Sequence, residues 1–246
     1  IPSAMTLHDY KLVCGTYRLE RGGKVCEECA GGRYYRCLLR RCQDGSLAKS
    51  ALTAAEMYLH HRLLRLWPMI DLFVSPSRFL KDKLAEMGFP GRIEVLPNFV
   101  VSEAFASDSV PQPDLFLYLG RLSPEKGLFT LLQAFQHLGA RLRILGDGPI
   151  RGELERAAAR LAPGRVSFLG HRPREEIARE LAAAAAVVVP SEWYENNPIS
   201  VLEAYAAGRP VIGARIGGIR ELVREGESGL SFGSGSAEEL GGKSCF

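Results

Sequence analysis

The sequence lacks any apolar run long enough to cross a bilayer. A spanning helix needs about 18 consecutive apolar residues, whereas the longest candidate is the alanine- and valine-rich stretch from Leu181 to Pro190. Internal repeats and low-complexity stretches are also missing, which argues against solenoid and disordered proteins. Hydrophobic residues make up 46% of the 246 positions, enough for one large or two modest domains with real cores.

Two common phosphate-binding fingerprints are missing as well. Gly146 and Gly148 are followed by Gly152, one residue too late for the dinucleotide-binding pattern G-x-G-x-x-G. Gly242-Lys243-Ser244 lacks the upstream glycine and the preceding strand of a P-loop. These absences argue against a nicotinamide-dependent dehydrogenase and a P-loop ATPase.

A large charge of one sign is missing too. The net charge of +3 is too small to indicate a nucleic-acid partner, and none is predicted. The distribution is uneven, because the segment from Lys11 to Lys49 holds nine Lys or Arg against four Asp or Glu, a net +5 that leaves the remainder near −2. This segment could meet an anionic lipid or a phosphate-bearing partner, or it could be an ordinary solvated surface.

The second half of the chain alternates strand-like and helical patterns. Strand-like runs occur at residues 115–119, 142–145, 166–169, 186–189 and 211–212, and each is followed by polar or glycine-rich residues and then a helical pattern. This order predicts a parallel, doubly wound sheet. Ligands of such sheets bind outside the carboxyl ends of the strands. The loops at Arg121, 146–148, His171, Glu195 and 217–218 are therefore expected to face one crevice.

The first part reads as about half of a doubly wound domain. Strand-like pieces at residues 4–7, 72–74 and 93–96 alternate with helical patterns, one with the stripe Leu52, Ala55, Leu59, Leu63 and Leu66 and one over 77–87. Upstream strands are expected to be missing, and the chain is expected to be truncated at the N-terminus and also at the C-terminus. A linker rich in Ser, Pro and Asp over residues 101–113 predicts two domains, residues 1–108 and 109–246.

Helix signals in the second part are clearest around Pro198. Asn197 suits the capping position, Pro198 the first helical position and Gly208 the left-handed exit of a helix over residues 198–207. Other helices are predicted to start near Glu125 and to cover residues 149–161 and 174–185.

Cysteines cluster in a predicted insertion at residues 14–42. Cys26 and Cys29 have the C-x2-C spacing that lets two thiolates share one zinc ion. A structural zinc held by Cys14, Cys26, Cys29 and Cys42 is one hypothesis, and reduced thiols in a packed loop are the other.

Two carboxylates stand out beside the 198–207 helix. Glu195 lies in the preceding loop and Glu203 two turns into the helix, so they could grip different parts of one ligand. The same pair could also be a plain loop charge and a helix-surface residue.

Several motifs, in one order along the chain, resemble those of the family 4 glycosyltransferases, which are retaining enzymes of the GT-B fold. Glu195 to Glu203, continuing as Ala204-Tyr205-Ala206-Ala207-Gly208-Arg209-Pro210-Val211-Ile212, is similar to their paired-glutamate signature. The other matching motifs are Gly120-Arg121-Leu122-Ser123-Pro124-Glu125-Lys126-Gly127, Gly146-Asp147-Gly148-Pro149, Gly217-Gly218 with Glu221, Thr6-Leu7-His8-Asp9-Tyr10 and Val95-Leu96-Pro97-Asn98. The resemblance implies two Rossmann-like doubly wound domains of α/β class, the first an incomplete acceptor-side domain and the second a donor domain.

A nucleoside diphosphate sugar, UDP- or GDP-linked, is the donor that the resemblance implies. Cleavage of its sugar–phosphate bond builds negative charge on the diphosphate, which Arg121 and Lys126 could receive after a strand and at a helix start. By resemblance Glu203 would hold the ribose hydroxyls and Glu195 the sugar hydroxyls. The predicted catalytic residues are Glu195, Arg121, Lys126 and His8, and the predicted donor-binding residues are Gly120, Arg121, Lys126, Gly146, Asp147, Gly148, His171, Arg172, Glu195, Asn196, Asn197, Pro198, Ile199, Glu203 and Gly218.

The sequence departs from the family at Asn196-Asn197-Pro198, where many members have Gly-Phe-Gly, and the amide side chains could alter donor choice. His8 follows a strand; related enzymes have a histidine near the donor sugar, although a strand-end histidine can also cap a loop. No nucleophile is evident, and the chain has no Asp-x-Asp pair of the kind that holds a metal in the other large glycosyltransferase fold. Metal-independent transfer without a cofactor is therefore predicted.

The implied partners are the nucleotide-sugar donor and a glycan or lipid-linked acceptor, in surface polysaccharide or glycoconjugate synthesis. The implied location is cytoplasmic, with peripheral association to the inner face of the membrane as an option. A sugar-nucleotide epimerase on the same fold, and a non-catalytic nucleotide-binding or interaction module, are the alternatives that remain.

Overall fold

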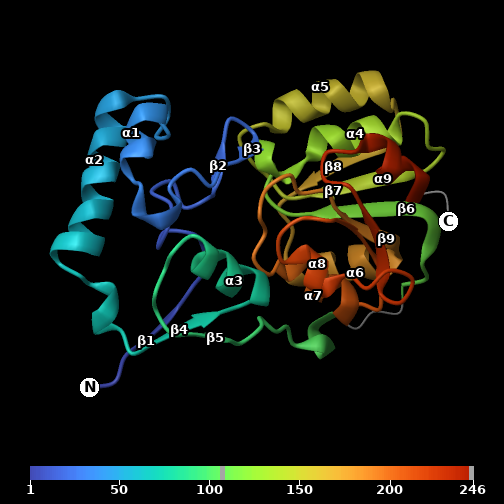
Figure 1. Cartoon of the computed structure of the whole chain (residues 1–246). Helices are drawn as coiled ribbons and strands as arrows, with labels where there is room; N and C mark the ends of the chain where they lie inside the picture. Colours follow the sequence, from blue (N-terminus) through green and yellow to red (C-terminus); the bar gives the residue numbers. More distant parts are fainter. Residues whose placement is uncertain (106–108, 244–246) are drawn as a thin grey trace. The chain divides into compact units, whose positions relative to one another are not determined.

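The computed structural model describes residues 1–105 and 109–243, and the chain forms two compact units, Ile1–Asn98 and Phe99–Phe246 (Figure 1). The division falls after Asn98 rather than at the predicted residue 108, which lies outside the described residues. The reason is that Phe105, 2% exposed, packs into the core of the C-terminal unit. No helix in the described ranges is both long enough and apolar enough to cross a membrane.

The C-terminal unit is built on a six-stranded parallel sheet. Its strands are β6 (Gln112–Leu119), β7 (Arg141–Leu145), β8 (Val166–Gly170), β9 (Ala184–Val189), β10 (Val211–Ala214) and β11 (Gly229–Phe232). Its helices are η4 (Ser102–Phe105), η5 (Pro124–Lys126), α4 (Leu128–Phe135), α5 (Arg151–Leu161), α6 (Arg174–Ala183), α7 (Ile199–Ala206), α8 (Ile219–Leu222) and α9 (Ala237–Lys243). The five predicted strands are confirmed, and β11 was not predicted.

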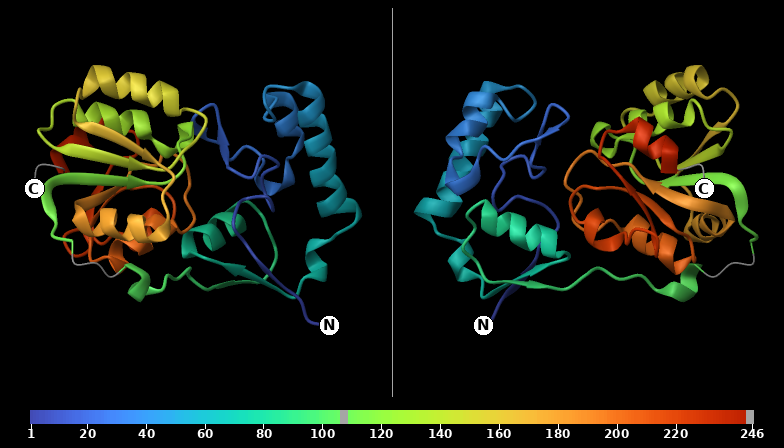
Figure 2. Two further views of the ribbon diagram at one scale, coloured as in Figure 1. Left: turned by 180° about the vertical axis from the view of Figure 1, so that it is seen from behind. Right: turned by 45° about the vertical axis from the view of Figure 1, so that its right-hand side comes forward.

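Helices cover both faces of this sheet. In Figure 1 and in both views of Figure 2, α4, α5 and α9 lie on one face and α6, α7 and α8 on the other. Successive side chains of a strand point to opposite faces, so Phe116 and Tyr118 of β6 pack in the α4–α5–α9 core while Leu117 packs in the opposite one. Both faces of the strands are thereby buried, which explains their nearly continuous apolar sequences.

The strand order β8-β7-β6-β9-β10-β11 places the reversal of winding between β6 and β9. Chain order runs outward from β6 to β8 on one side and from β9 to β11 on the other. Ligands of open α/β sheets bind beyond the carboxyl ends of the strands at such a reversal. Residues following Leu119 and Val189 are therefore placed where a ligand is expected.

The N-terminal unit contains a three-stranded parallel sheet in the order β1-β4-β5 and a two-stranded antiparallel hairpin, β2 with β3. The strands are β1 (Ala4–Thr6), β2 (Glu20–Arg21), β3 (Lys24–Val25), β4 (Leu72–Ser75) and β5 (Ile93–Val95). The helices are η1 (Ala30–Gly32), α1 (Tyr35–Arg40), α2 (Leu47–Tyr58), the π-helical turn η2 (Leu59–Leu63), η3 (Trp67–Met69) and α3 (Arg78–Glu86). The hairpin and α1 belong to the cysteine-rich insertion, for which no elements were predicted.

The leucine stripe of the α2 region is not the buried face of that helix. Leu52 and Leu63 are 73% and 76% exposed, whereas Ser50, Ala54 and Met57 are buried. The helix thus packs through a face adjacent to the stripe. Its start is well defined, because Ser46 accepts a hydrogen bond from the backbone N–H of Lys49.

Two predicted helix starts are corrected. The helix expected from Glu125 is a short 3-10 turn over Pro124–Lys126, and α4 begins only at Leu128 because Gly127 adopts a left-handed conformation with φ 68°. Helix α7 begins at Ile199 with Pro198 as its capping residue, so Asn197 does not cap it. In addition, α6 ends at Ala183, where β9 follows at once.

The structure does not favour the zinc hypothesis over its alternative, reduced thiols in a packed loop. Within residues 1–105 and 109–243, no three His, Cys, Asp or Glu side chains come together in a way that could hold a metal ion. Cys14, Cys26, Cys29 and Cys42 are free thiols. Burial, with the neighbouring thiols as a further cause, raises the pKa of Cys29 and of Cys42 to about 12, so both thiols are neutral at neutral pH.

This environment predicts low thiol reactivity at Cys29 and Cys42. The thiolate is the reactive species, so at pH 8 both residues should react with an alkylating reagent much more slowly in the folded chain than in urea. Mass-spectrometric peptide mapping after timed labelling measures this for each cysteine. Equal rates in the folded and unfolded states would contradict the buried, neutral environment.

Candidate functional site

Two adjoining pockets lie at the reversal point of the C-terminal sheet. The first, here called the lysine pocket, has a volume of about 230 Å³ and contains Lys126, Glu195 and Ser191. The second, called the histidine pocket, has a volume of about 380 Å³ and contains His171, Arg172 and Asp147. Both pockets are lined by Leu119, Gly120 and Glu203, so these residues stand at the junction between them.

Most of the predicted donor-binding residues line one of these pockets. Those in the lysine pocket are Gly120, Lys126, Glu195, Pro198, Ile199 and Glu203, and those in the histidine pocket are Gly120, Arg121, Gly146, Asp147, His171, Arg172 and Glu203. Gly148, Asn196, Asn197 and Gly218 do not line either pocket. His8 belongs to the N-terminal unit, where it follows β1 and is exposed.

Glu195 is the centre of the lysine pocket. The ammonium of Lys126 donates to Glu195 Oε1 at 2.6 Å, and Ser191 Oγ donates to the same oxygen at 2.7 Å. The side chains of Lys126 and Glu195 are 21% and 10% exposed, so this ion pair is only partly solvated. The Lys126 ammonium also lies 5.1 Å from the ring centroid of Trp193, within range of a cation–π interaction.

Backbone contacts fix the loops that carry this pair. The N–H of Glu192 donates to the carbonyl of Glu125 at 2.9 Å, which ties the loop after β9 to the turn that holds Lys126. A Cβ atom added at Gly127 would collide with the carbonyl oxygen of Pro190. Glycine is therefore needed at this position both for its left-handed φ and for the close approach of the two loops.

Gly127→Ala is expected to destabilise the protein by several kcal/mol and to displace Lys126. A left-handed alanine alone costs about 1–2 kcal/mol, and the collision with Pro190 adds to it. Gly164→Ala is the matched control, because Gly164 has φ 72° with no atom near the added Cβ. Urea unfolding and nucleotide titration of both variants measure the difference. Equal losses in the two variants would show that the close approach to Pro190 is unimportant.

The loops after β6 and β7 form one wall of the histidine pocket. The N–H of Leu122 donates to the carbonyl of Asp147 at 2.9 Å, and a Cβ atom at Gly148 would collide with the backbone of Leu122. The phenol of Tyr118 donates to the carbonyl of Arg121 at 2.8 Å. Burial and the carboxylates of Glu195 and Glu125 raise the pKa of Tyr118, which keeps this donor neutral.

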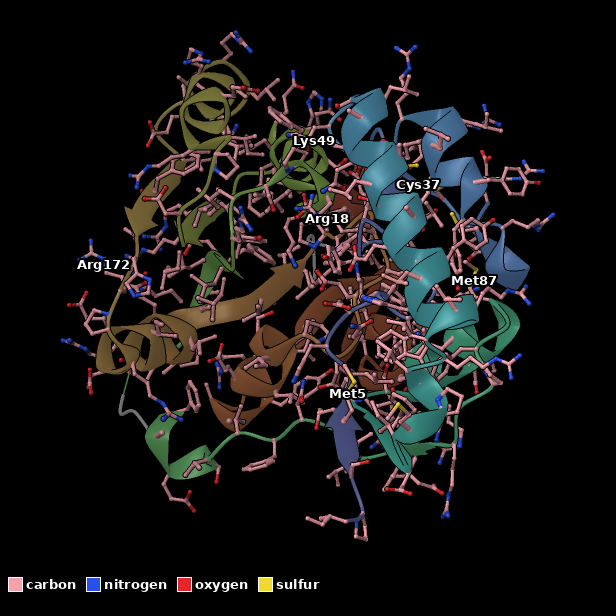
Figure 3. The ribbon with its side chains drawn as sticks, turned by 90° about the vertical axis from the view of Figure 1, so that its left-hand side faces the viewer. Met5, Arg18, Cys37, Lys49, Met87 and Arg172 are labelled. Atoms are coloured by element: carbon pink, nitrogen blue, oxygen red, sulfur yellow. The ribbon has the colours of Figure 1, made fainter. Side chains whose placement is uncertain are left out.

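Glu203 at the junction is half-buried, and burial raises its pKa above the ordinary value, while the nearby Arg174 opposes the shift. Arg172, labelled in Figure 3, donates to the carbonyl of Leu169 at 2.9 Å and pairs with Glu176 at 3.2 Å. Its guanidinium is thus partly engaged. The Glu203 carboxylate can accept hydrogen bonds from ligand hydroxyls at the junction, and the cations in the two pockets can donate to phosphate oxygens.

Three functional residues were not among those predicted. Ser191 lies four residues before Glu195, so its sequence position gave a weak signal. Tyr118 is an ordinary aromatic of a buried strand, and Arg174 is an ordinary first-turn residue of α6. Ser191 and Tyr118 contact residues only four and three positions away, but the folded loops were needed to show these contacts, whereas Arg174 acts on Glu203 from a distant segment.

Comparison with known proteins agrees with this geometry. The family model described as "Glycosyl transferases group 1" matches residues 102–244. The lipopolysaccharide core biosynthesis glycosyltransferase LpsE of Rhizobium meliloti is 31% identical over 176 residues, covering 68% of this chain and 51% of LpsE. The amylovoran biosynthesis glycosyltransferase AmsK of Erwinia amylovora is 31% identical over 194 residues, covering 72% of this chain and 47% of AmsK.

Solved structures show the same fold. Anabaena HepE, crystallised with UDP and glucose, matches 98% of this chain and 60% of its own with a TM-score of 0.68 at 21% identity. A sucrose-phosphate synthase from Thermosynechococcus elongatus matches 75% of this chain and 51% of its own, with a TM-score of 0.63 at 26% identity. The α/β fold of GT-B type with Rossmann-like domains is thereby confirmed. The chain spans about half the length of the curated relatives named above. Because the family model covers more than half of it, the chain belongs to the group 1 glycosyl transferases.

Proposed function

We propose that this protein is a retaining, metal-independent glycosyltransferase of family 4 that transfers a sugar from a nucleoside diphosphate sugar to an acceptor hydroxyl. The observation that carries the proposal is the pair of pockets joined at Glu203, one holding Lys126 with Glu195 and the other His171 with Arg172. A nucleoside diphosphate sugar is an extended ligand, and the chemistry of its base, ribose, diphosphate and sugar matches the residues of the two pockets and their junction.

The pockets suggest how such a donor would lie. The base would occupy the histidine pocket, and the ribose diol would donate to the Glu203 carboxylate, which accepts two hydrogen bonds. The diphosphate would receive charge-assisted hydrogen bonds from Lys126 and Arg121. Lys126 would exchange its bond to Glu195 for a phosphate oxygen, leaving Glu195 to accept from the sugar hydroxyls.

The chemistry assigned to these residues is mainly electrostatic. The bond between the anomeric carbon and the phosphate oxygen breaks as the acceptor oxygen bonds to the same carbon from the same face. The acceptor proton passes to the leaving phosphate, so no enzymic base is required. Cations preorganised around the diphosphate stabilise the charge that grows there. Because Arg121 and Lys126 supply this charge, neither a metal nor a cofactor is assigned.

The acceptor is proposed to be a glycan or a lipid-linked glycan, in surface polysaccharide or glycoconjugate synthesis. Lipopolysaccharide core biosynthesis by LpsE and amylovoran biosynthesis by AmsK support this choice of acceptor. His8 is proposed to contribute to catalysis from a position near the transferred sugar. We propose that the protein is cytoplasmic and associates peripherally with the inner face of the membrane. No nucleic-acid partner is assigned.

Calorimetry with UDP, GDP, ADP and dTDP tests the donor assignment. One of these nucleotides should bind with one-to-one stoichiometry, and UDP or GDP is expected to bind most tightly. Asn196→Gly is a useful companion variant, because the family often has glycine there and a change in donor preference would implicate this position. Failure of all four nucleotides to bind the folded chain would contradict the proposal.

Transfer assays distinguish the reaction classes. Turnover of the donor sugar that depends on an added acceptor indicates a transferase, whereas conversion of the donor sugar without an acceptor indicates an epimerase. Nucleotide binding without either reaction, in the full-length protein, would indicate a non-catalytic module. For residues 1–246 by themselves, we expect nucleotide binding with poor transfer, because the N-terminal unit has a parallel sheet of only three strands in its described residues.

A further inference from the structure

A separate pocket lies within the N-terminal unit, and the donor site does not use it. It has a volume of about 740 Å³ and is formed by two segments, residues 16–22 leading through β2 and residues 40–45 between α1 and α2. Four arginines line it, namely Arg18, Arg21, Arg40 and Arg41. We call it the arginine pocket.

The acidic residues of this pocket are already engaged. Asp44 pairs with Lys49 at 2.8 Å, and Glu20 accepts a hydrogen bond from the backbone N–H of Gly23 at 2.5 Å. Lys49 and Arg18, both labelled in Figure 3, together favour the charged form of Asp44 and lower its pKa. Because four arginines face two carboxylates, the pocket keeps a net positive charge.

Three of the four guanidiniums form no direct ion pair within the described residues. Arg40 pairs with Glu28 at 3.0 Å, but none of the ion pairs found among residues 1–105 and 109–243 involves Arg18, Arg21 or Arg41. All four arginines are exposed to solvent. The four arginines around this concave surface outnumber its two carboxylates, Glu20 and Asp44, and such an excess of positive charge attracts an anion from solution.

The backbone of the pocket is held in an unusual conformation. Tyr17, Arg41 and Asp44 have positive φ angles of 67°, 49° and 51°, although none of them is a glycine. Such positions cost free energy and cluster at ligand sites. Here they turn the chain so that residues 40–45 face residues 16–22, and the Cys42 N–H fixes the turn by donating to the carbonyl of Cys37 at 3.1 Å.

We propose that the arginine pocket binds the phosphate groups of an anionic acceptor, a sugar phosphate or a diphosphate-linked glycan. Guanidinium groups bind phosphate oxygens in bidentate fashion. The volume is within the range of small-molecule sites and leaves room for a sugar beside the phosphates. This inference rests on the proposed transferase function and names the chemical class of its acceptor.

Calorimetry on the whole chain with inorganic pyrophosphate tests it. The donor site is first saturated with whichever nucleoside diphosphate binds, so that pyrophosphate reports on a second site. The double variant Arg18→Gln/Arg41→Gln should weaken this second binding at least about tenfold, because each substitution removes charge-assisted hydrogen bonds. Arg62→Gln/Arg65→Gln is the matched control: it removes the same charge from exposed arginines outside the pocket and should leave binding unchanged.

The outcomes separate the competing explanations. Absence of second-site binding, or equal weakening in both double variants, would overturn the inference while leaving nucleotide binding, and hence the proposed function, intact. If no nucleotide binds, the proposed function fails, and the two double variants still locate the pyrophosphate site. The last measurement is binding of the protein to anionic vesicles of phosphatidylglycerol and to neutral vesicles of phosphatidylcholine. Arginine-dependent binding to the anionic vesicles without pyrophosphate binding would assign the pocket to a membrane surface instead.

Discussion

Replacing Lys126 by alanine is expected to weaken nucleoside diphosphate binding about 10- to 100-fold and to lower sugar transfer by about 10² to 10³. The binding loss reflects the hydrogen bonds between the ammonium and the phosphates. The larger loss in rate reflects the charge that grows on the diphosphate during bond cleavage. Calorimetry and a timed transfer assay measure the two effects separately.

The Lys126 variant also removes the cationic partner of Glu195. Glu195, whose side chain is 10% exposed in the wild type, would keep the hydrogen bond from Ser191 but lose its cationic partner, and an unpaired, poorly solvated carboxylate destabilises a fold. The double variant Lys126→Ala/Glu195→Gln removes that charge. It should recover stability relative to Lys126→Ala without recovering nucleotide binding, which separates the two roles of the lysine.

Lys243→Ala is the matched control for this experiment. Lys243 forms a comparable ion pair, at 2.6 Å from Glu225, outside both pockets. Its loss should leave nucleotide affinity and transfer rate unchanged. If Lys126→Ala behaved like Lys243→Ala in a folded protein, the lysine pocket could not be the diphosphate site.

The sequence predicted the parts of this molecule that depend on local pattern. The run at residues 115–119 is apolar on both faces because helices cover both sides of the sheet, and so a buried strand could be predicted from it directly. The loops at the strand ends could be assigned to one crevice because parallel strands end on the same side. Arg121, Gly146, His171 and Glu195, which this reasoning assigned to the crevice, line the two pockets, whereas Gly120, Lys126 and Glu203 were indicated by the family resemblance.

The features that were missed depend on contacts between distant segments. Helix α4 starts after Gly127 and not at Glu125 because the turn must approach Pro190, a constraint that lies more than sixty positions along the chain. The exposed leucine stripe of α2 shows helical periodicity without specifying which face is covered. The arginine pocket depends on positive φ angles at Tyr17 and Arg41, which side-chain identity alone does not indicate.

The second large effect is expected at Glu203. Glu203→Gln should weaken nucleoside diphosphate binding about 10- to 100-fold, because a neutral amide replaces a carboxylate that accepts from the ribose diol. A 2′,3′-dideoxy nucleoside diphosphate provides the matching ligand control. The wild-type chain and the variant should bind this ligand with equal, weak affinity. A variant that also lost affinity for the dideoxy ligand would show that Glu203 acts on something other than the ribose.

The pH dependence provides an independent check. Burial raises the pKa of Glu203 in the folded chain, so the carboxylate becomes protonated, and nucleotide affinity falls, at a higher pH than for an ordinary glutamate. Calorimetry in a series of buffers should show this decline in the wild-type chain and a flat profile in Glu203→Gln. A decline of the same size in the variant would assign the titration to another group.

The same pKa shift gives the opposite sign for stability. A carboxyl whose folded-state pKa is raised stabilises the fold at pH values below its unfolded-state pKa and loses that contribution as the pH rises through the folded-state pKa. At neutral pH the ionised Glu203 therefore destabilises the unliganded protein. Glu203→Gln should unfold at a temperature equal to or higher than that of the wild type while binding the nucleotide worse. If Glu203 only supported the fold, its substitution would lower both the stability of the protein and its affinity for the nucleotide. A variant with unchanged or higher stability and weaker nucleotide binding would instead identify Glu203 as a ligand-binding carboxylate that is retained at a cost to stability.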